Sequence, residues 1–208
     1  MKCSFRFEKA LRAGGCEVIA GIDEAGRGPL AGPVVVCAVI LPIKFRHRTL
    51  TDSKQLSAKQ RELIYAELTG REDVCWSISM ADHHEIDRLN ILWATCAAMR
   101  RAAAALVSAP HHVLIDGNPV RDFPYPQTAI PGGDARSYSI AAASVIAKVT
   151  RDRHMAEMDG CYPGYEFAQH KGYGTALHLE RLNQHGPCPI HRRSFLPVRQ
   201  MELPLPLS

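Results

Sequence analysis

The sequence predicts an α/β fold, a sheet flanked by helices, followed by a smaller and mostly helical appendage. Between residues 17 and 158, short apolar runs rich in valine and isoleucine alternate with alanine-rich segments of helical periodicity. Acidic residues follow the ends of these runs, where α/β proteins usually place ligands. After Asp159 the composition changes to glycine, proline, tyrosine, histidine and basic residues, which indicates a second unit.

Length and composition allow a well-packed core in a soluble protein. The chain has 208 residues, 46% of them hydrophobic, and a formal net charge of +4. This mildly basic charge permits a nucleic-acid partner without requiring one. The seven scattered cysteines form no Cys-x-x-Cys pair, which favours free thiols in a reducing compartment. With no signal-like start and no apolar run of about 20 residues, we expect a cytoplasmic protein without a membrane span, acting as a monomer.

Eight helices and strands are expected between a variable lead-in at residues 1–16 and a disordered tail at residues 199–208, with the appendage at residues 159–198. The expected strands lie at 17–23, 33–41, 73–80 and 112–115, and the expected helices at 57–68, 90–107, 137–155 and 175–184.

Local signals support these elements in order. A glycine- and proline-rich turn between the first two apolar strands is typical of a hairpin. Ser57 stands three residues before Gln60, the spacing of a capping box that opens a helix. Residues 73–80 alternate as a strand does, and the alanine-rich helix that follows is closed by Pro110. Strand 112–115 then delivers an aspartate to a Gly-Asn-Pro turn.

Four acids, Asp23, Glu24, Asp116 and Asp134, stand where apolar structure gives way to glycine or to a helix start. Any one of them alone is explained as well by a solvated carboxylate or a helix N-cap. Together they have the composition of a two-metal phosphoryl-transfer site, whose carboxylates hold cations about 3.5 to 4 Å apart. Oxygen-only ligands favour Mg²⁺ or Mn²⁺ over zinc.

The adjacent acids Asp23 and Glu24 set a geometric condition. In a regular strand their side chains would point to opposite faces and would not share an ion. We therefore expect the strand to end at Asp23, with Gly26 turning the chain, whereas a strand continuing through Gly28 would count against shared ligation. The glycine-flanked Arg27 then offers a cation and a bare backbone to a phosphodiester.

The helix after Asp134 repeats one face at three- and four-residue steps, formed by Ser137, Ala141, Ser144, Lys148 and Asp152. Small residues on this face would let the helix lie close to the metal site, and Lys148 can reach a phosphate. Asp152 is either a fifth acid near the site or a surface partner of Arg151 or Arg153.

Further phosphate contacts are expected from Ser53 and Lys54, although the Asp-Ser-Lys tripeptide is equally well a polar turn. The appendage mixes rings and cations as nucleic-acid-binding surfaces do, in Tyr162, Tyr165, Phe167, His170, Lys171, Tyr173, His178, His191, Arg192 and Arg193. Core packing and surface solvation explain each of these equally well. The histidine doublets His83-His84 and His111-His112 lack zinc-ligand spacing. The glycines around Arg27 match neither a dinucleotide fingerprint nor a Walker loop.

Several motifs together resemble bacterial ribonuclease HII. They are Gly-Ile-Asp-Glu-Ala-Gly-Arg-Gly-Pro-Leu-Ala-Gly-Pro-Val-Val at 21–35, Asp-Ser-Lys at 52–54, Asp-Gly at 116–117, Gly-Asp at 133–134, Ser-Ile-Ala-Ala-Ala-Ser-Val-Ile-Ala-Lys-Val-Thr-Arg-Asp at 139–152, His-Lys-Gly-Tyr-Gly-Thr at 170–175 and Pro-Ile-His-Arg-Arg-Ser-Phe at 189–195. The resemblance spans about residues 17–198.

The resemblance implies a ribonuclease H-like fold, a mixed sheet flanked by helices, with a small C-terminal helical extension after the catalytic core at 17–158. It implies cleavage of the RNA strand of RNA/DNA hybrids and cutting 5′ to ribonucleotides embedded in duplex DNA, leaving 5′-phosphate and 3′-hydroxyl. By motif, the four acids would be the catalytic metal ligands. Gly26, Arg27 and Gly28 would read the 2′-hydroxyl at the junction, and Tyr173 would stack on the deoxyribose that follows.

Two other functions remain open from the sequence. A non-catalytic nucleic-acid-binding module would use the same groove, but acids facing phosphates would weaken its binding by repulsion. A metal-dependent phosphatase for small substrates would not need the aromatic and basic extension. The residues at 200–205 lack the paired aromatics of a sliding-clamp peptide, so recruitment through the tail is not expected.

Overall fold

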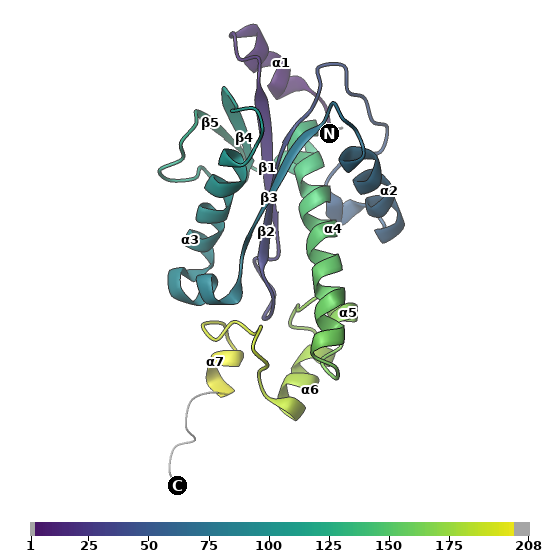
Figure 1. The fold of residues 1–208 in the computed structure, drawn as a ribbon, viewed down its shortest axis with the longest axis vertical. Helices are drawn as coiled ribbons and strands as arrows, with labels where there is room; N and C mark the ends of the chain where they lie inside the picture. Colours follow the sequence, from purple (N-terminus) through teal and green to yellow (C-terminus); the bar gives the residue numbers. More distant parts are fainter. Residues whose placement is uncertain (1–2, 202–208) are drawn as a thin grey trace.

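The computed structural model describes residues 3–201, in which a sheet lies between helices and the last helices gather at one end (Figure 1). The strands are β1 (Ile19–Ala25), β2 (Val34–Ile40), β3 (Cys75–Ala81), β4 (His112–Asp116) and β5 (Gln127–Ile130). The helices are α1 (Arg6–Ala13), α2 (Ala58–Thr69), α3 (His83–Ala104), α4 (Tyr138–Cys161), α5 (Phe167–His170), α6 (Ala176–His185) and α7 (Val198–Met201), with 3-10 turns η1 (Ser53–Gln55) and η2 (Gly133–Ala135). Within residues 3–201, no helix is both long and apolar enough to cross a membrane.

The sheet is mixed, with strand order β3-β2-β1-β4-β5. β2 runs antiparallel to both β1 and β3, which confirms the predicted hairpin. β4 lies parallel to β1 on its other side, and β5 continues the parallel part. The carboxyl ends of β1 and β4 therefore meet at one edge of the sheet.

Strand alternation divides the core between the two faces of the sheet. On β2, Val35, Cys37 and Val39 pack with α2 and α4, whereas the alternate residues pack with α3. Both faces of the central strands are buried, which accounts for near-continuous apolar runs in their sequences. The faces matter for function, because each side chain near the ends of β1 and β4 is assigned to the α4 side or the α3 side by its place in this alternation.

Helix α4 lies against β1 almost backbone to backbone. A Cβ atom at Gly21 would collide with the backbone of Ser139 and Ile140, so only glycine permits this approach. Ala141 and Ser144 are buried in the same helix. Ala141 and Ser144 of the predicted small-residue face are thus buried as close packing requires, and the start of α4 lies against the middle of β1.

The sequence analysis did not predict the short helices α5 and α7, and it also missed helix α1, strand β5 and the first segment of α3. The lead-in contains α1, whose Glu8 is buried and accepts hydrogen bonds from the Ser137 hydroxyl (2.7 Å) and the Ser139 N–H (3.1 Å). Strand β5 is a short edge strand of four residues between prolines. A first helical segment precedes Asn90, where a positive φ of 64° breaks α3. The expected helix start at 90 is visible as this break, because the Asn90 side chain accepts from the N–H groups of Leu92 and Trp93.

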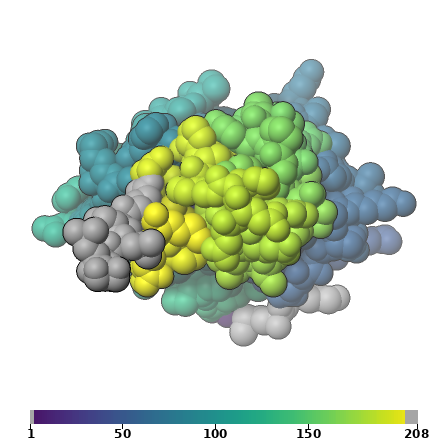
Figure 2. Space-filling model, turned by 90° about the horizontal axis from the view of Figure 1, so that it is seen from below, coloured from purple at the N-terminus to yellow at the C-terminus, as the bar shows by residue number. Residues whose placement is uncertain are grey.

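The C-terminal extension lies beside the C-terminal part of α4, as the view from below shows (Figure 2), and it packs around buried aromatic rings. Its buried members include Tyr165, Phe167, His170, His178, His191 and Arg192. For these six the interpretation as nucleic-acid contacts is wrong, because their side chains form the interior of the extension. Tyr173 is 40% exposed. Residues 199–201 close helix α7 instead of starting the expected tail, and residues 202–208 lie outside the described part of the chain.

Candidate active site

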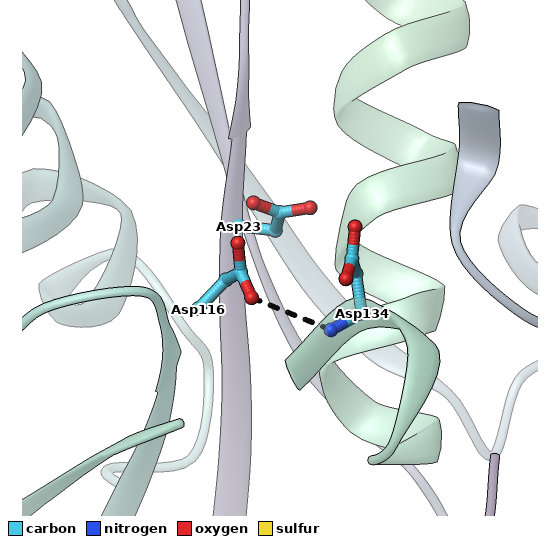
Figure 3. Close-up of side chains that lie close together, drawn as sticks. All are labelled: Asp23, Asp116 and Asp134. Atoms are coloured by element: carbon cyan, nitrogen blue, oxygen red, sulfur yellow. Dashed lines mark hydrogen bonds between the residues drawn. The ribbon is translucent and has the colours of Figure 1, made fainter. Parts of the chain in front are cut away.

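Three aspartates converge where β1, β4 and η2 meet. The parallel register pairs Ile22 with Ile115, so the next residues, Asp23 and Asp116, are neighbours on the α4 side of the sheet. Asp134 faces them from η2 (Figure 3). One carboxylate oxygen from each of the three lies within 4.8 Å of the others. The predicted convergence of these three acids is therefore present in the structure.

The η2 turn is tied to β4 through the Asp116 carboxylate. Asp116 Oδ1 accepts from the Gly133 N–H at 2.6 Å. It also accepts from the Asp134 N–H at 3.4 Å, the bond drawn in Figure 3. A side chain at Gly133 would collide with Ile140 of α4. Gly133 thus allows close packing against α4, and Asp134 supplies a carboxylate to the site.

Burial and mutual repulsion make this group unfavourable when fully charged. Burial, followed by the charges of Glu24 and Asp116, raises the pKa of Asp23 well above its ordinary value. Burial and then Asp116 raise the pKa of Asp134 to about 6. A divalent cation relieves both effects, and three carboxylates match its preference for oxygen ligands. The donor set therefore fits a divalent metal.

Glu24 lies apart from this group of three. β1 continues to Ala25, so the expected strand end at Asp23 is wrong by two residues, although the strand stops before Gly28. Strand alternation consequently turns Glu24 to the α3 side, where its Oε1 lies 3.3 Å from Nη1 of Arg27. Among residues 3–201, the metal-ligand group of mutually close acids does not include Glu24.

Most of the predicted site residues line one cavity of about 230 Å³. Nine of the eleven are found there: Asp23, Glu24, Gly26, Arg27, Gly28, Ser53, Lys54, Lys148 and Tyr173. Gly26 has a φ of +98° and turns the chain as expected, while Arg27 and Gly28 are exposed. The remaining two, Asp116 and Asp134, complete the carboxylate group at the cavity's acidic end.

Cations and hydroxyls on the cavity wall have defined positions. Lys54 is 82% exposed, and its Nζ lies 4.0 Å from the Asp134 carboxylate. Ser53 is buried and its hydroxyl is 2.9 Å from that of Ser144, a contact that joins η1 to α4. Lys148 binds Asp152 at 2.7 Å. Within residues 3–201, Asp152 therefore lies outside the three-aspartate group, and its ion pair is with Lys148 rather than with Arg151 or Arg153, the surface partners considered from the sequence.

A second cavity of about 150 Å³ lies on the other side of the Arg27–Glu24 pair. Asp116 and Asn118 line it from the β4 turn, and Cys96 and Met99 line it from α3. This cavity was not predicted from the sequence. Asn118 was visible there only as a turn residue, and the α3 residues only as one side of a packed helix.

Comparison with known proteins agrees with this geometry. A family model described as Ribonuclease HII matches residues 20–198. The chain belongs to the ribonuclease HII family. The matched range includes the three clustered aspartates and the whole lining of the larger cavity. The predicted family, ribonuclease H activity and ribonuclease H-like fold are confirmed at this level.

Relatives in the ribonuclease HII family cover nearly all of the chain. A Ribonuclease HII of Idiomarina loihiensis is 52% identical over 88% of this chain and 98% of its own length. Another, from Anaeromyxobacter, is 51% identical over 94% of this chain, which spans only 62% of that relative. The crystal structure of the ribonuclease H2 from Pyrococcus horikoshii superimposes with a TM-score of 0.74 at 28% identity, covering 89% of this chain and 97% of that one.

Proposed function

We propose that this chain is a divalent-metal-dependent endonuclease acting on RNA/DNA hybrids and on ribonucleotides embedded in duplex DNA. The proposed cut lies 5′ to the ribonucleotide and leaves a 5′-phosphate and a 3′-hydroxyl. The observation that carries the proposal is the placement of a three-aspartate group and the Gly26–Gly28 loop at one cavity. Chemistry on a phosphate and recognition of the neighbouring sugar can then occur together.

Asp23, Asp116 and Asp134 would hold the metal, with Mg²⁺ or Mn²⁺ favoured by their oxygen donors. A bound divalent ion supplies charge stabilisation at the phosphate and a more acidic water. In the proposed phosphodiester hydrolysis, water adds to phosphorus and the bond between phosphorus and the 3′-oxygen breaks. The 3′-oxygen takes up a proton. Glu24 borders the reacting phosphate from the α3 side, where it also holds Arg27.

The proposed selectivity for RNA rests on the Gly26–Gly28 loop. Within residues 3–201, the N–H groups of Arg27 and Gly28 donate to no backbone carbonyl, so they are available to a ligand oxygen. The 2′-hydroxyl distinguishes RNA from DNA and is an acceptor for such donors. Tyr173 is exposed on the same cavity and offers a ring to the next sugar. Lys54 and Lys148 offer positive charge to phosphates.

The smaller cavity provides a place for the strand to continue past the cut. It shares Glu24 and Arg27 with the larger cavity, and Asp116 reaches it as well. The nucleotide on the far side of the scissile phosphate would lie over Asn118 and Cys96. One copy of the chain supplies every residue of the site, which fits a monomer, and seven free cysteines fit a reducing cytoplasm.

Three labelled duplexes test the proposal: DNA with one ribonucleotide, the all-DNA equivalent, and a long RNA/DNA hybrid. We expect Mg²⁺- or Mn²⁺-dependent cutting of the first and third, with one cut 5′ to the single ribonucleotide. Cutting of the all-DNA duplex, or activity that survives chelation, would contradict the proposal. Binding without cutting at any metal concentration would favour the non-catalytic module instead.

A further inference from the structure

Two buried arginines hold the loop between β1 and β2 by its carbonyl groups. The guanidinium of Arg192 donates to the carbonyl oxygens of Gly26 (2.6 Å), Arg27 (2.9 Å), Pro29 (2.7 Å) and Gly32 (3.0 Å). Arg151 donates to Pro33 (2.9 Å), Ala31 (3.1 Å) and Lys171 (3.0 Å). Both side chains are fully buried. We call these two side chains the arginine clamp.

The clamp determines which way the loop's peptide groups face. In a planar trans peptide, the C=O of one residue and the N–H of the next point in opposite directions. Because the carbonyls of Gly26 and Arg27 are directed at Arg192, the N–H groups of Arg27 and Gly28 are directed away from it. Within residues 3–201 neither of these two N–H groups has a backbone hydrogen-bond partner, and both residues line the cavity.

The surroundings of the two clamp guanidinium groups suit hydrogen bonds to carbonyl oxygens rather than ion pairs with carboxylates. Within residues 3–201, neither Arg151 nor Arg192 has a carboxylate oxygen within 4.0 Å. Burial is the largest effect on both, and it lowers the pKa of Arg151 and brings that of Arg192 to about 9. An arginine fork satisfies several carbonyls at once, whereas the single ammonium of a lysine has a different geometry. An apolar replacement would leave buried carbonyls without partners.

We propose that Arg192 is a positioning residue for ribonucleotide selectivity, which orients the Arg27 and Gly28 N–H groups toward the sugar of the substrate. Arg151 supports the same loop from the α4 side, where its side chain fills the space beside Gly26. The inference rests on the proposed function and deepens it. Selectivity for the 2′-hydroxyl then depends on a residue more than 160 positions away in the sequence.

Docking of the extension itself has independent support. The backbone N–H of Arg192 donates to Leu30 O at 2.8 Å, the Leu30 N–H donates to Gly172 O at 2.8 Å, and the Gly32 N–H donates to Ile190 O at 2.9 Å. These bonds do not involve the guanidinium. A substitution of Arg192 that preserves them loosens the loop's peptide groups while the extension stays in place.

The test compares Arg192→Lys and Arg192→Gln with Arg153→Lys, an exposed arginine of the same chain paired with Glu62. Substrates are duplexes with one ribonucleotide or one 2′-fluoro nucleotide at the same position. We expect the Arg192 variants to lose about tenfold or more in kcat/KM on the ribonucleotide, with 2′-fluoro cleavage changed by less than about threefold. Arg153→Lys should keep both. Calorimetric Mn²⁺ affinity should remain within about twofold of the wild type in all variants.

The inference would be overturned if the Arg192 variants kept the wild-type ratio of kcat/KM between the ribonucleotide and the 2′-fluoro substrate. This holds whether both values stay unchanged or both fall by the same factor. Rescue by Arg192→Lys would also overturn it, because charge without the fork would then suffice. If the wild type does not prefer the ribonucleotide at all, the proposed function fails, and the clamp has no selectivity to set.

If neither Arg192→Lys nor Arg192→Gln folds, a measurement on the protein with its native Arg192 still tests the inference. Amide exchange at Arg27 and Gly28 is followed by NMR in a catalytically blocked Asp116→Asn background. We expect about tenfold or greater protection on binding the ribonucleotide duplex and little on binding its all-DNA equivalent. Equal protection by both duplexes, or none by either, would contradict the orientation of these groups toward the 2′-hydroxyl.

Discussion

The aspartate group and the arginine clamp are two buried polar centres separated by a few residues of β1, and they are satisfied in opposite ways. The three aspartates lie close to one another with no cation nearer than the 4.0 Å contact of Lys54, among residues 3–201. The arginines are matched by carbonyls of the chain itself. The comparison shows that one centre is left for an external ion to complete, whereas the other is complete and holds the loop beside it.

The largest effect is expected at the incomplete centre. Asp116→Asn should lower kcat by about 10³-fold or more with substrate binding largely intact, because a neutral amide cannot serve as an anionic ligand. Cleavage and binding of the single-ribonucleotide duplex are the measurements. Asp122→Asn, at an exposed acid in the next turn, is the matched control and should retain activity. Near-normal turnover of Asp116→Asn would remove the aspartate group from the mechanism.

Alanine substitutions at two glycines of the Gly26–Gly28 loop distinguish a role in folding from a role in substrate recognition. Gly26→Ala combines a positive φ of +98° with a collision against Arg151, so we expect destabilisation by about 2 kcal/mol or more. A Cβ at Gly28 meets no atom within 4 Å, so Gly28→Ala should melt like the wild type. It should nevertheless lose about tenfold in kcat/KM if the substrate approaches this backbone closely. Thermal melts and cleavage rates of the pair check this, and normal activity of Gly28→Ala would count against close approach.

The repulsion among the aspartates gives a pH-dependent cost in the metal-free protein. The pKa of Asp134 is raised to about 6 from an ordinary 3.8, so its contribution to stability is present at low pH and is lost as pH rises through about 6. Asp134→Asn should therefore stabilise the metal-free protein above about pH 6, raising Tm by about 2–4 °C per kcal/mol of relieved repulsion. The difference should vanish at about pH 4 and shrink with excess Mg²⁺. A variant less stable than the wild type at about pH 8 would contradict this reading.

The buried histidines of the extension predict a pH dependence of opposite sign. Burial lowers the pKa of His178 and of His191 to about 4, and their Nε2 atoms lie 3.0 Å apart. Their contribution to stability is complete above about pH 6.5 and is lost as pH falls toward about 4. His178→Asn should flatten the fall in unfolding free energy over this range by up to about 1.4 kcal/mol per pH unit. Urea unfolding at several pH values measures it, with exposed His84→Asn as the control that keeps the wild-type slope.

Local signals explain what the sequence predicted well. The hairpin, the Ser57 capping box and the strand that ends at Asp116 depend on residues close together in the chain, and all three are present. The aspartate group followed from the same logic, because strand ends and glycine turns are visible in one dimension. Edge strand β5 and helix α1 were missed because their stability comes from long-range contacts, such as the Glu8 bond to Ser137.

The residue roles at the site that were not predicted also depend on long-range contacts. Arg192 and Arg151 look like surface cations in the sequence, since nothing local reveals that they donate to six carbonyl groups of the β1–β2 loop and to that of Lys171. The position of Glu24 depended on how far β1 continues, which ladder bonds to β2 decide rather than the Gly26 turn. Burial and pairing are tertiary properties, so a charged residue's role was the hardest to predict.

The adjacent Asp23 and Glu24 make the site sensitive to strand register. A one-residue slip of β1 would turn Glu24 to the α4 side and Asp23 toward α3. A longer side chain would then meet Asp116 and Asp134, and the metal site would be lost even if the sheet still formed. After refolding, catalytic activity would therefore report only the molecules in which β1 has the correct register. Circular dichroism would report every molecule that has formed the sheet.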